Sequence, residues 1–182
     1  KAVDDPQLGT MVKAVQQFLD HLSIKTAHLV GHSMGGHVAS EFALLFPAAA
    51  ASLTLICSAG LGEEINNDYI SGFVSSASRK ELKPHLKALF ADETLVSRSM
   101  VDDLMKYKRL DGVQTFLDAL SVNLFANGTQ AANVSGKLAS LPCPIQIIWG
   151  EKDGVIPQSH ANAVEGAAVT IIHQDTNLAR EA

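Results

Sequence analysis

The chain has 182 residues, of which 47% are hydrophobic and 18% charged, so its composition is that of a globular protein with one domain. Its 14 Lys and Arg against 19 Asp and Glu give a formal net charge of −5, which excludes a global field that would recruit nucleic acid or an anionic membrane. The longest apolar runs are well short of the ~20 residues of a membrane helix, and the first residues lack a signal-peptide pattern. We expect a cytoplasmic protein that acts on a small, largely neutral substrate.

The two cysteines and the two chain ends give further expectations. Cys57 and Cys143 lie inside or beside apolar runs, which predicts buried, reduced thiols rather than a disulfide or metal ligands. No pattern for a metal or a cofactor is seen. The chain begins at Lys1 rather than Met and stops soon after an apolar run, so we expect processing or truncation at both ends.

The first half of the sequence predicts a helix, a strand, a tight turn and a second helix. Residues 26–30 form a short apolar run that ends at Gly31, and residues 34–46 have a helical pattern that stops at Pro47. Residues 8–24 carry apolar side chains at three- and four-residue steps, which predicts an amphipathic helix. Those apolar residues are Met11, Val12, Val15, Phe18, Leu19 and Leu22.

Three more apolar runs follow, at residues 53–57, 145–149 and 169–172. Their near-continuous hydrophobicity is typical of strands that are buried on both faces of a parallel sheet. We therefore expect these three runs and residues 26–30 to be adjacent parallel strands of an α/β fold.

The segment between the strands at residues 53–57 and 145–149 is helical in pattern and too long for a loop. It comprises residues 61–140. We interpret it as a helical lid inserted into a core made of residues 1–60 and 141–182. Its position predicts that it covers a pocket at one edge of the sheet. The lid side chains expected to line an apolar acyl or alkyl site there are Phe73, Leu104 and Phe116.

Residues 31–36 read Gly-His-Ser-Met-Gly-Gly and match G-x-S-x-G directly after a strand and directly before a helix. In this context the serine lies on a strained turn, and a side chain at position 31 or 35 is expected to collide with the neighbouring strand or helix. Ser33 Oγ would stand exposed above the sheet, and the Met34 N–H would face a developing oxyanion. A glycine-rich turn whose serine only caps a helix is the alternative. His32 should point away from the Ser33 hydroxyl, which favours a packing role for it.

A carboxylate follows the third strand, in the loop of residues 149–157. Asp153 lies at the carboxyl end of that strand, where sites of open α/β sheets form, and it is our candidate to orient a catalytic histidine. Asp153 comes after Ser33 in the chain, which agrees with the triad order serine, acid, histidine that accompanies this serine motif. Glu151 is the nearby alternative, and an aspartate before Gly154 is also common in ordinary turns.

These residues resemble the α/β-hydrolase superfamily. More narrowly, residues 18–163 are similar to the hydrolase-like domain of the dihydrolipoamide acetyltransferase component of bacterial acetoin dehydrogenase complexes. The elbow is shared by the whole superfamily, whereas the lid segments favour this branch. The segments that carry the resemblance are residues 28–36, 58–66, 83–86, 106–112 and 148–153.

The resemblance implies a Ser-Asp-His triad and places its first two members at Ser33 and Asp153. The family histidine should fall near residues 176–178, where this chain has Thr-Asn-Leu instead. His173 lies several positions earlier, at the end of a strand, and is either the catalytic base or a structural histidine. The resemblance also implies strands before the elbow that supply a second oxyanion donor, so we interpret the chain as the carboxyl-terminal part of a longer protein.

Two functions follow from these patterns. In the first, a histidine activates Ser33, which attacks an acyl carbonyl and passes the acyl group from an acyl-serine to water, a thiol or an alcohol. The resemblance implies transfer involving acetyl-dihydrolipoamide and coenzyme A, with other subunits of a multienzyme complex as partners. In the second, the fold is a non-catalytic module for binding or complex assembly, an alternative favoured by the missing histidine.

Overall fold

The computed structural model describes residues 5–173, and of Ala126 it describes only the backbone. All four strands are parallel and lie in the order β1-β2-β3-β4. Their bounds are Ala27–His32 for β1, Ala50–Ile56 for β2, Ile145–Gly150 for β3 and Ala168–Ile172 for β4. Because the strands are parallel, the residues that follow them meet at one edge of the sheet, as the sequence predicts.

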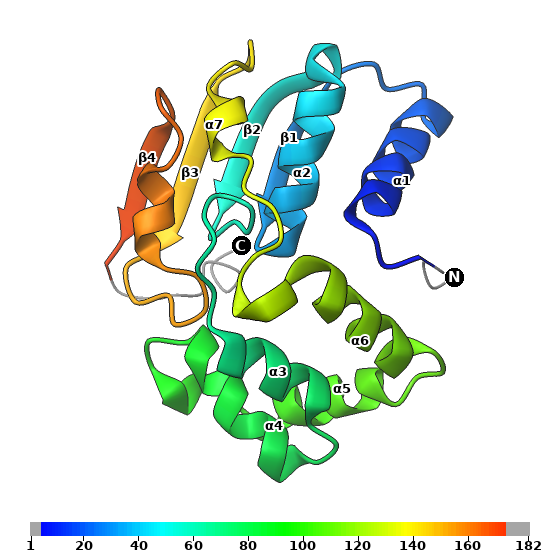
Figure 1. Ribbon diagram of the computed structural model, residues 1–182, viewed down its shortest axis with the longest axis vertical. Helices are drawn as coiled ribbons and strands as arrows, with labels where there is room; N and C mark the ends of the chain where they lie inside the picture. The colour runs from blue at the N-terminus through cyan, green and yellow to red at the C-terminus, as the bar shows by residue number, and fades with distance from the viewer. Residues whose placement is uncertain (1–4, 174–182) are drawn as a thin grey trace.

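Helix α2 (Met34–Leu45) packs against β1, and helix α1 (Leu8–His21) packs against α2 (Figure 1). On β1, Leu29 and Gly31 are buried on the side of α2. The alternate side chains of the strand are exposed, and Val30 has 66% of its surface open to solvent. In the part of the chain that the structure describes, one face of this edge strand is therefore uncovered.

The segment between β2 and β3 is mainly helical, and Figure 1 shows most of it beyond the carboxyl ends of the strands. We call residues 67–138 the helical insertion. Its α-helices are α3 (Asn67–Ser75), α4 (Arg79–Leu86), α5 (Arg98–Lys108), α6 (Val113–Leu124) and α7 (Ser135–Leu138). Three-residue 3₁₀ turns lie at Lys87–Leu89, Glu93–Leu95 and Ala126–Gly128.

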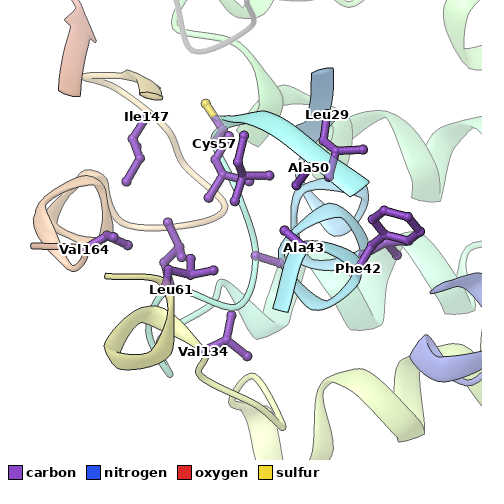
Figure 2. Packing of buried hydrophobic residues seen from close by; sticks show 14 of the residues in the cluster. Leu29, Phe42, Ala43, Ala50, Cys57, Leu61, Val134, Ile147 and Val164 are labelled. Carbon is purple, nitrogen blue, oxygen red and sulfur yellow. The ribbon is translucent and has the colours of Figure 1, made fainter. Parts of the chain in front are cut away.

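The chain has two separate apolar cores. The larger one lies between the sheet and its helices, and Figure 2 shows Leu29, Ala43 and Ile147 within it. The smaller one belongs to the helical insertion and is made of Leu82, Leu86, Phe90, Val96, Val101 and Met105. Helices α4 and α5 are therefore stabilised largely by side chains of the insertion, whereas Val134 and Leu138 at its end belong to the larger core.

This second core changes one expectation. Phe73 and Leu104 pack against it, because the faces of α3 and α5 that carry them point into the insertion. The aromatic ring of Phe73 also stacks on Tyr69, with ring centroids 6.0 Å apart, and lies 5.3 Å from the Lys108 ammonium. The insertion is helical as predicted, but these two side chains are core residues of the insertion.

Candidate active site

The turn between β1 and α2 holds Ser33 in an unusual backbone conformation. Its φ is 52° and its ψ is −123°, a combination that costs a residue with a side chain free energy and persists only when the surroundings enforce it. Two hydrogen bonds of 3.0 Å do so: the Ser33 N–H donates to the Ile56 carbonyl, and the Ala59 N–H donates to the Ser33 carbonyl. The end of β2 thus fixes the turn that carries the serine.

Glycines make this close approach of backbones possible. A Cβ added at Gly31 would lie 2.4 Å from the Gly35 carbonyl oxygen, and one added at Gly36 would lie 2.2 Å from Ser58 Oγ. The expected collision at position 31 is therefore confirmed. At position 35 it is wrong, because a Cβ there would meet nothing within 4 Å. Gly36, one residue later, is the glycine that faces β2.

Met34 is the first residue of α2, so its N–H belongs to the helix start, where backbone donors have no partner within the helix. A cavity of about 370 Å³ lies beside it. The cavity is bounded by the starts of α1 and α2 and by the end of α6, and its lining includes Leu8, Met34, His37, Leu124 and Phe125. Phe116 is not among the residues that line this cavity.

The acid loop after β3 is held by backbone and by a buried tryptophan. Asp153 Oδ1 accepts hydrogen bonds from the N–H groups of Val155 at 2.8 Å and Ile156 at 3.0 Å. Trp149 is fully buried, and its indole N–H donates to the Ile156 carbonyl at 3.3 Å. The two bonds to Oδ1 fix the orientation of the Asp153 carboxylate at the edge of the sheet that carries Ser33.

The charge of the Asp153 carboxylate contributes to the pKa values of three neighbouring groups. Burial raises the pKa of the Cys57 thiol to about 12; a backbone hydrogen bond from Gly150 opposes this increase, and the Asp153 carboxylate adds to it. Burial, with a smaller contribution from Asp153, also raises the pKa of the Tyr69 hydroxyl to about 12. Desolvation lowers the pKa of His32, and Asp153 opposes that shift. Cys57 is therefore a neutral thiol beside the site and not a competing thiolate.

His32 and His173 occupy places that differ from those of a catalytic base. His32 keeps much of its surface open to solvent at the end of β1, although neighbouring groups desolvate its ring enough to lower its pKa. The His173 side chain is 75% exposed, and its Nδ1 lies 3.4 Å from a carboxylate oxygen of Glu151. Among residues 5–173, no side chain is hydrogen-bonded to Ser33 Oγ. The family position at residues 176–178 lies outside the described residues.

The segment after β2 links the acid loop to the helical insertion. The Asn66 N–H donates to the Val155 carbonyl, and the Asn66 side chain donates to the Gly154 carbonyl, both at 2.8 Å. Gln130 connects the same segment to the end of the insertion, since its side chain accepts from the Gly60 N–H at 2.7 Å and donates to the Glu64 carbonyl at 2.9 Å. The sequence alone assigned no role to these side chains, although Asn66 ends one of the segments, residues 58–66, that carry the family resemblance.

We also searched the described residues for a metal-binding cluster and for a membrane-spanning helix. Within residues 5–173, no group of three or more His, Cys, Asp or Glu side chains is arranged to hold a metal ion. Across the same residues, no helix is both long and apolar enough to span a bilayer.

A family model for the alpha/beta hydrolase fold matches residues 4–170. The chain therefore belongs to the α/β-hydrolase fold family. It is 44% identical over 168 residues to the dihydrolipoyllysine-residue acetyltransferase component of the acetoin cleaving system of Cupriavidus necator, covering 92% of this chain and 45% of that protein. The protein of the same name from Pseudomonas putida is 44% identical over 172 residues, with 94% and 46% covered. The chain spans about half the length of these relatives.

The fold also resembles that of solved α/β-hydrolase structures. A meta-cleavage product hydrolase from Pseudomonas fluorescens IP01, complexed with acetates, superposes with a TM-score of 0.81 over 94% of this chain and 65% of that one. The sequence identity is 19%, so this likeness establishes the fold alone. Together with the relatives, it confirms both the expected fold class and the resemblance found in the elbow and insertion segments.

Proposed function

We propose that this chain carries the nucleophile of a serine-dependent acyl transferase or hydrolase. Ser33 Oγ attacks an acyl carbonyl, the Met34 N–H donates to the oxyanion, and the acyl-serine then passes its acyl group to water, a thiol or an alcohol. The observation that carries the proposal is the backbone of Ser33, whose φ of 52° is enforced by hydrogen bonds to β2. A serine that only caps a helix needs no such strain, and Ser33 makes no side-chain cap hydrogen bond.

In this proposal Asp153 orients the base. Its Oδ1 accepts hydrogen bonds from two N–H groups, which fix the direction of the carboxylate, as the acid of a triad requires. Glu151 is the alternative acid: it is exposed, and its carboxylate rather than that of Asp153 contacts His173. His173 remains our candidate base among the described residues, and it would have to leave Glu151 to reach Ser33.

The substrate belongs to the same proposal. The cavity beside Met34 has a volume of about 370 Å³, enough for a short acyl group with its neighbouring atoms. Since the two relatives are named as acetyltransferase components of an acetoin cleaving system, we propose an acetyl group carried by dihydrolipoamide or coenzyme A, with partners in a multienzyme complex in the cytoplasm. Residues 61–140 would act as the lid over this cavity, and residues 1–60 with 141–182 as the core.

A fluorophosphonate probe tests the proposal directly, because it reacts with an activated serine and not with an ordinary hydroxyl. We expect the probe to label the protein and to fail to label the Ser33→Ala variant. Ser58→Ala is the matched control and should still be labelled, because the Ser58 hydroxyl is buried and donates to the Ala59 carbonyl at 2.8 Å. His173→Gln then assigns the base: labelling that disappears with it supports His173, and labelling that persists removes His173 from the mechanism.

One observation favours the second function, a binding or assembly module. His173 is exposed and paired with Glu151, so residues 5–173 do not bring a base to Ser33 through a hydrogen bond. If the fold serves only for assembly, the fluorophosphonate leaves Ser33 unmodified in the complete protein as well as in this chain. That outcome would overturn the enzyme proposal in favour of the module.

A further inference from the structure

Cys57 has a strained backbone at the carboxyl end of β2. It directly follows the last residue of that strand, and its φ is 43°. A residue with a side chain adopts this left-handed region only at a cost in free energy, whereas glycine adopts it freely. Four non-glycine residues among those described have a positive φ, and two of them, Ser33 and Cys57, lie at this edge of the sheet. Strain of this kind clusters at functional sites.

The Cys57 side chain bridges the end of β3 and the acid loop. Its sulfur accepts a hydrogen bond from the Gly150 N–H, and the Asp153 carboxylate is its second hydrogen-bond partner. The Asp153 N–H in turn donates to the Gly150 carbonyl at 3.2 Å, so the three residues form one closed group of contacts. The Cys57 N–H donates to the Ile148 carbonyl at 2.9 Å, which fixes the strained residue against β3. Cys57 is only 4% exposed, so bulk water has little access to these contacts.

The chemistry of the two groups fixes the direction of the hydrogen bond between Cys57 and Asp153. A carboxylate offers only acceptors. The thiol keeps its proton at neutral pH, because burial raises its pKa to about 12. The Cys57 S–H therefore donates, and it is a third donor to this carboxylate, beside the N–H groups of Val155 and Ile156.

A buried cysteine more often serves only to fill space. Such a residue needs neither a strained backbone nor a carboxylate partner, and Cys57 has both. The second cysteine, Cys143, provides a comparison within the same chain. It is half-buried and precedes β3, at the opposite edge of the sheet from Asp153.

We propose that Cys57 is a positioning residue for the candidate acid, with its S–H holding the Asp153 carboxylate toward the base. This inference rests on the function proposed above. It makes β2 the element that sets two members of the site. The carbonyl of Ile56 accepts from the Ser33 N–H and holds the nucleophile, and the side chain of the next residue holds the acid.

Infrared spectroscopy of the S–H stretch tests this hydrogen bond without reference to catalysis. Cys143→Ser leaves Cys57 as the one thiol of the 182-residue chain. An S–H group that donates to a carboxylate has a lowered stretching frequency, and the neutral amide of Asp153→Asn is a weaker acceptor. We expect the band to move to higher frequency when Asp153→Asn is added to Cys143→Ser. It should stay in place when the matched control, Glu151→Gln, is added.

Ester turnover by the complete protein tests the positioning role. Cys57→Ala keeps the Cβ, and with it the backbone strain, but removes the donor. We expect kcat to fall by about fivefold with KM within about twofold of the parent, since the acid acts on the base and not on the bound ester. Cys57→Ser keeps a donor and should restore kcat to within about twofold of the parent. Cys143→Ser, which removes a thiol outside this group, should match the parent.

Two outcomes would overturn the inference. A band that Asp153→Asn leaves in place shows that the thiol does not donate to Asp153, whether or not Ser33 is reactive. Equal losses of kcat in Cys57→Ala and Cys57→Ser show that the sulfur only fills space. A parent protein without turnover that depends on Ser33 instead contradicts the function proposed above, and the band then still supports or overturns the hydrogen bond.

Discussion

The carboxyl ends of β1 and β4 differ in how firmly the structure holds the residue that follows them. At the end of β1, Ser33 is fixed by two backbone hydrogen bonds to the β2 region, and an added Cβ would collide with neighbouring atoms at Gly31 and Gly36. At the end of β4, His173 is 75% exposed and has one contact, at 3.4 Å, with Glu151. The proposed nucleophile is thus held in one conformation by its surroundings, whereas His173, the proposed base, is not. A mutation should therefore have large effects at the first place and small ones at the second.

The largest effect, a loss of ester turnover, is expected for a substitution at Asp153. Asp153→Asn keeps the size of the side chain and an oxygen for the Val155 and Ile156 N–H groups, but it removes the charge that orients and stabilises a histidine cation. We expect ester turnover by the complete protein to fall by about 10²–10⁴-fold with the fold unchanged. Glu151→Gln is the matched control and should change turnover by less than about threefold. A loss in Glu151→Gln that exceeds the loss in Asp153→Asn would assign the acid role to Glu151.

A second effect concerns this chain by itself. In the proposed mechanism the Met34 N–H is the oxyanion donor assigned among residues 5–173, and loss of a second donor typically costs about 10²–10³-fold in rate. We therefore expect the 182-residue chain alone to turn over a small activated ester at least about 10²-fold more slowly than an intact relative. Turnover within tenfold of that relative, if abolished by Ser33→Ala, would show that the chain already holds a complete site.

The glycines of the elbow give a smaller effect, on stability. Gly31→Ala places a Cβ 2.4 Å from the Gly35 carbonyl oxygen, and relief of that contact requires the backbone to move. We expect the free energy of unfolding to fall by about 3 kcal/mol, measured by urea denaturation. Gly35→Ala meets nothing within 4 Å on α2 and should be neutral or stabilising by up to about 1 kcal/mol, since alanine favours helix. The same loss in both variants would contradict the elbow geometry.

The smallest effect concerns pH. Burial lowers the pKa of His37, and Glu41, 3.9 Å away, opposes that shift. As pH falls through the usual histidine range, the unfolded chain takes up this proton first, so the free energy of unfolding decreases on acidification. In His37→Leu this contribution is absent, and the loss of stability between about pH 7.5 and about pH 5.5 should be smaller than in the parent. An unchanged loss would show that His37 does not titrate differently in the folded state.

Much of the fold could be predicted because it depends on local patterns. The apolar runs gave all four strands, and Pro47 marked the end of α2, which the structure places at Leu45. The contacts across elements could not be predicted in the same way. Phe73 and Leu104 turned inward because the insertion has its own core, and Gly36 rather than Gly35 faces Ser58 because the helix rotates by about 100° per residue.

The candidate site shows the same limit. Ser33 and Asp153 follow strands within recognisable sequences, so their positions at one sheet edge could be inferred. The neutral thiol of Cys57 beside Asp153 depends on burial, which a sequence pattern does not reveal. The contact between His173 and Glu151 depends on how β4 pairs with β3, whose register aligns Gly150 with Ile172.

Detection of the acyl-enzyme tests the central claim, that Ser33 is a pre-formed nucleophile, most directly. The complete protein is mixed with 4-nitrophenyl acetate, the release of nitrophenol is followed before steady state, and the quenched protein is digested and examined by mass spectrometry. We predict a burst of nitrophenol close to the concentration of protein, with one acetyl group on the peptide that contains Ser33 and neither burst nor acetyl group in Ser33→Ala. Linear release that Ser33→Ala leaves unchanged, with acetyl groups only on lysines, would contradict the account.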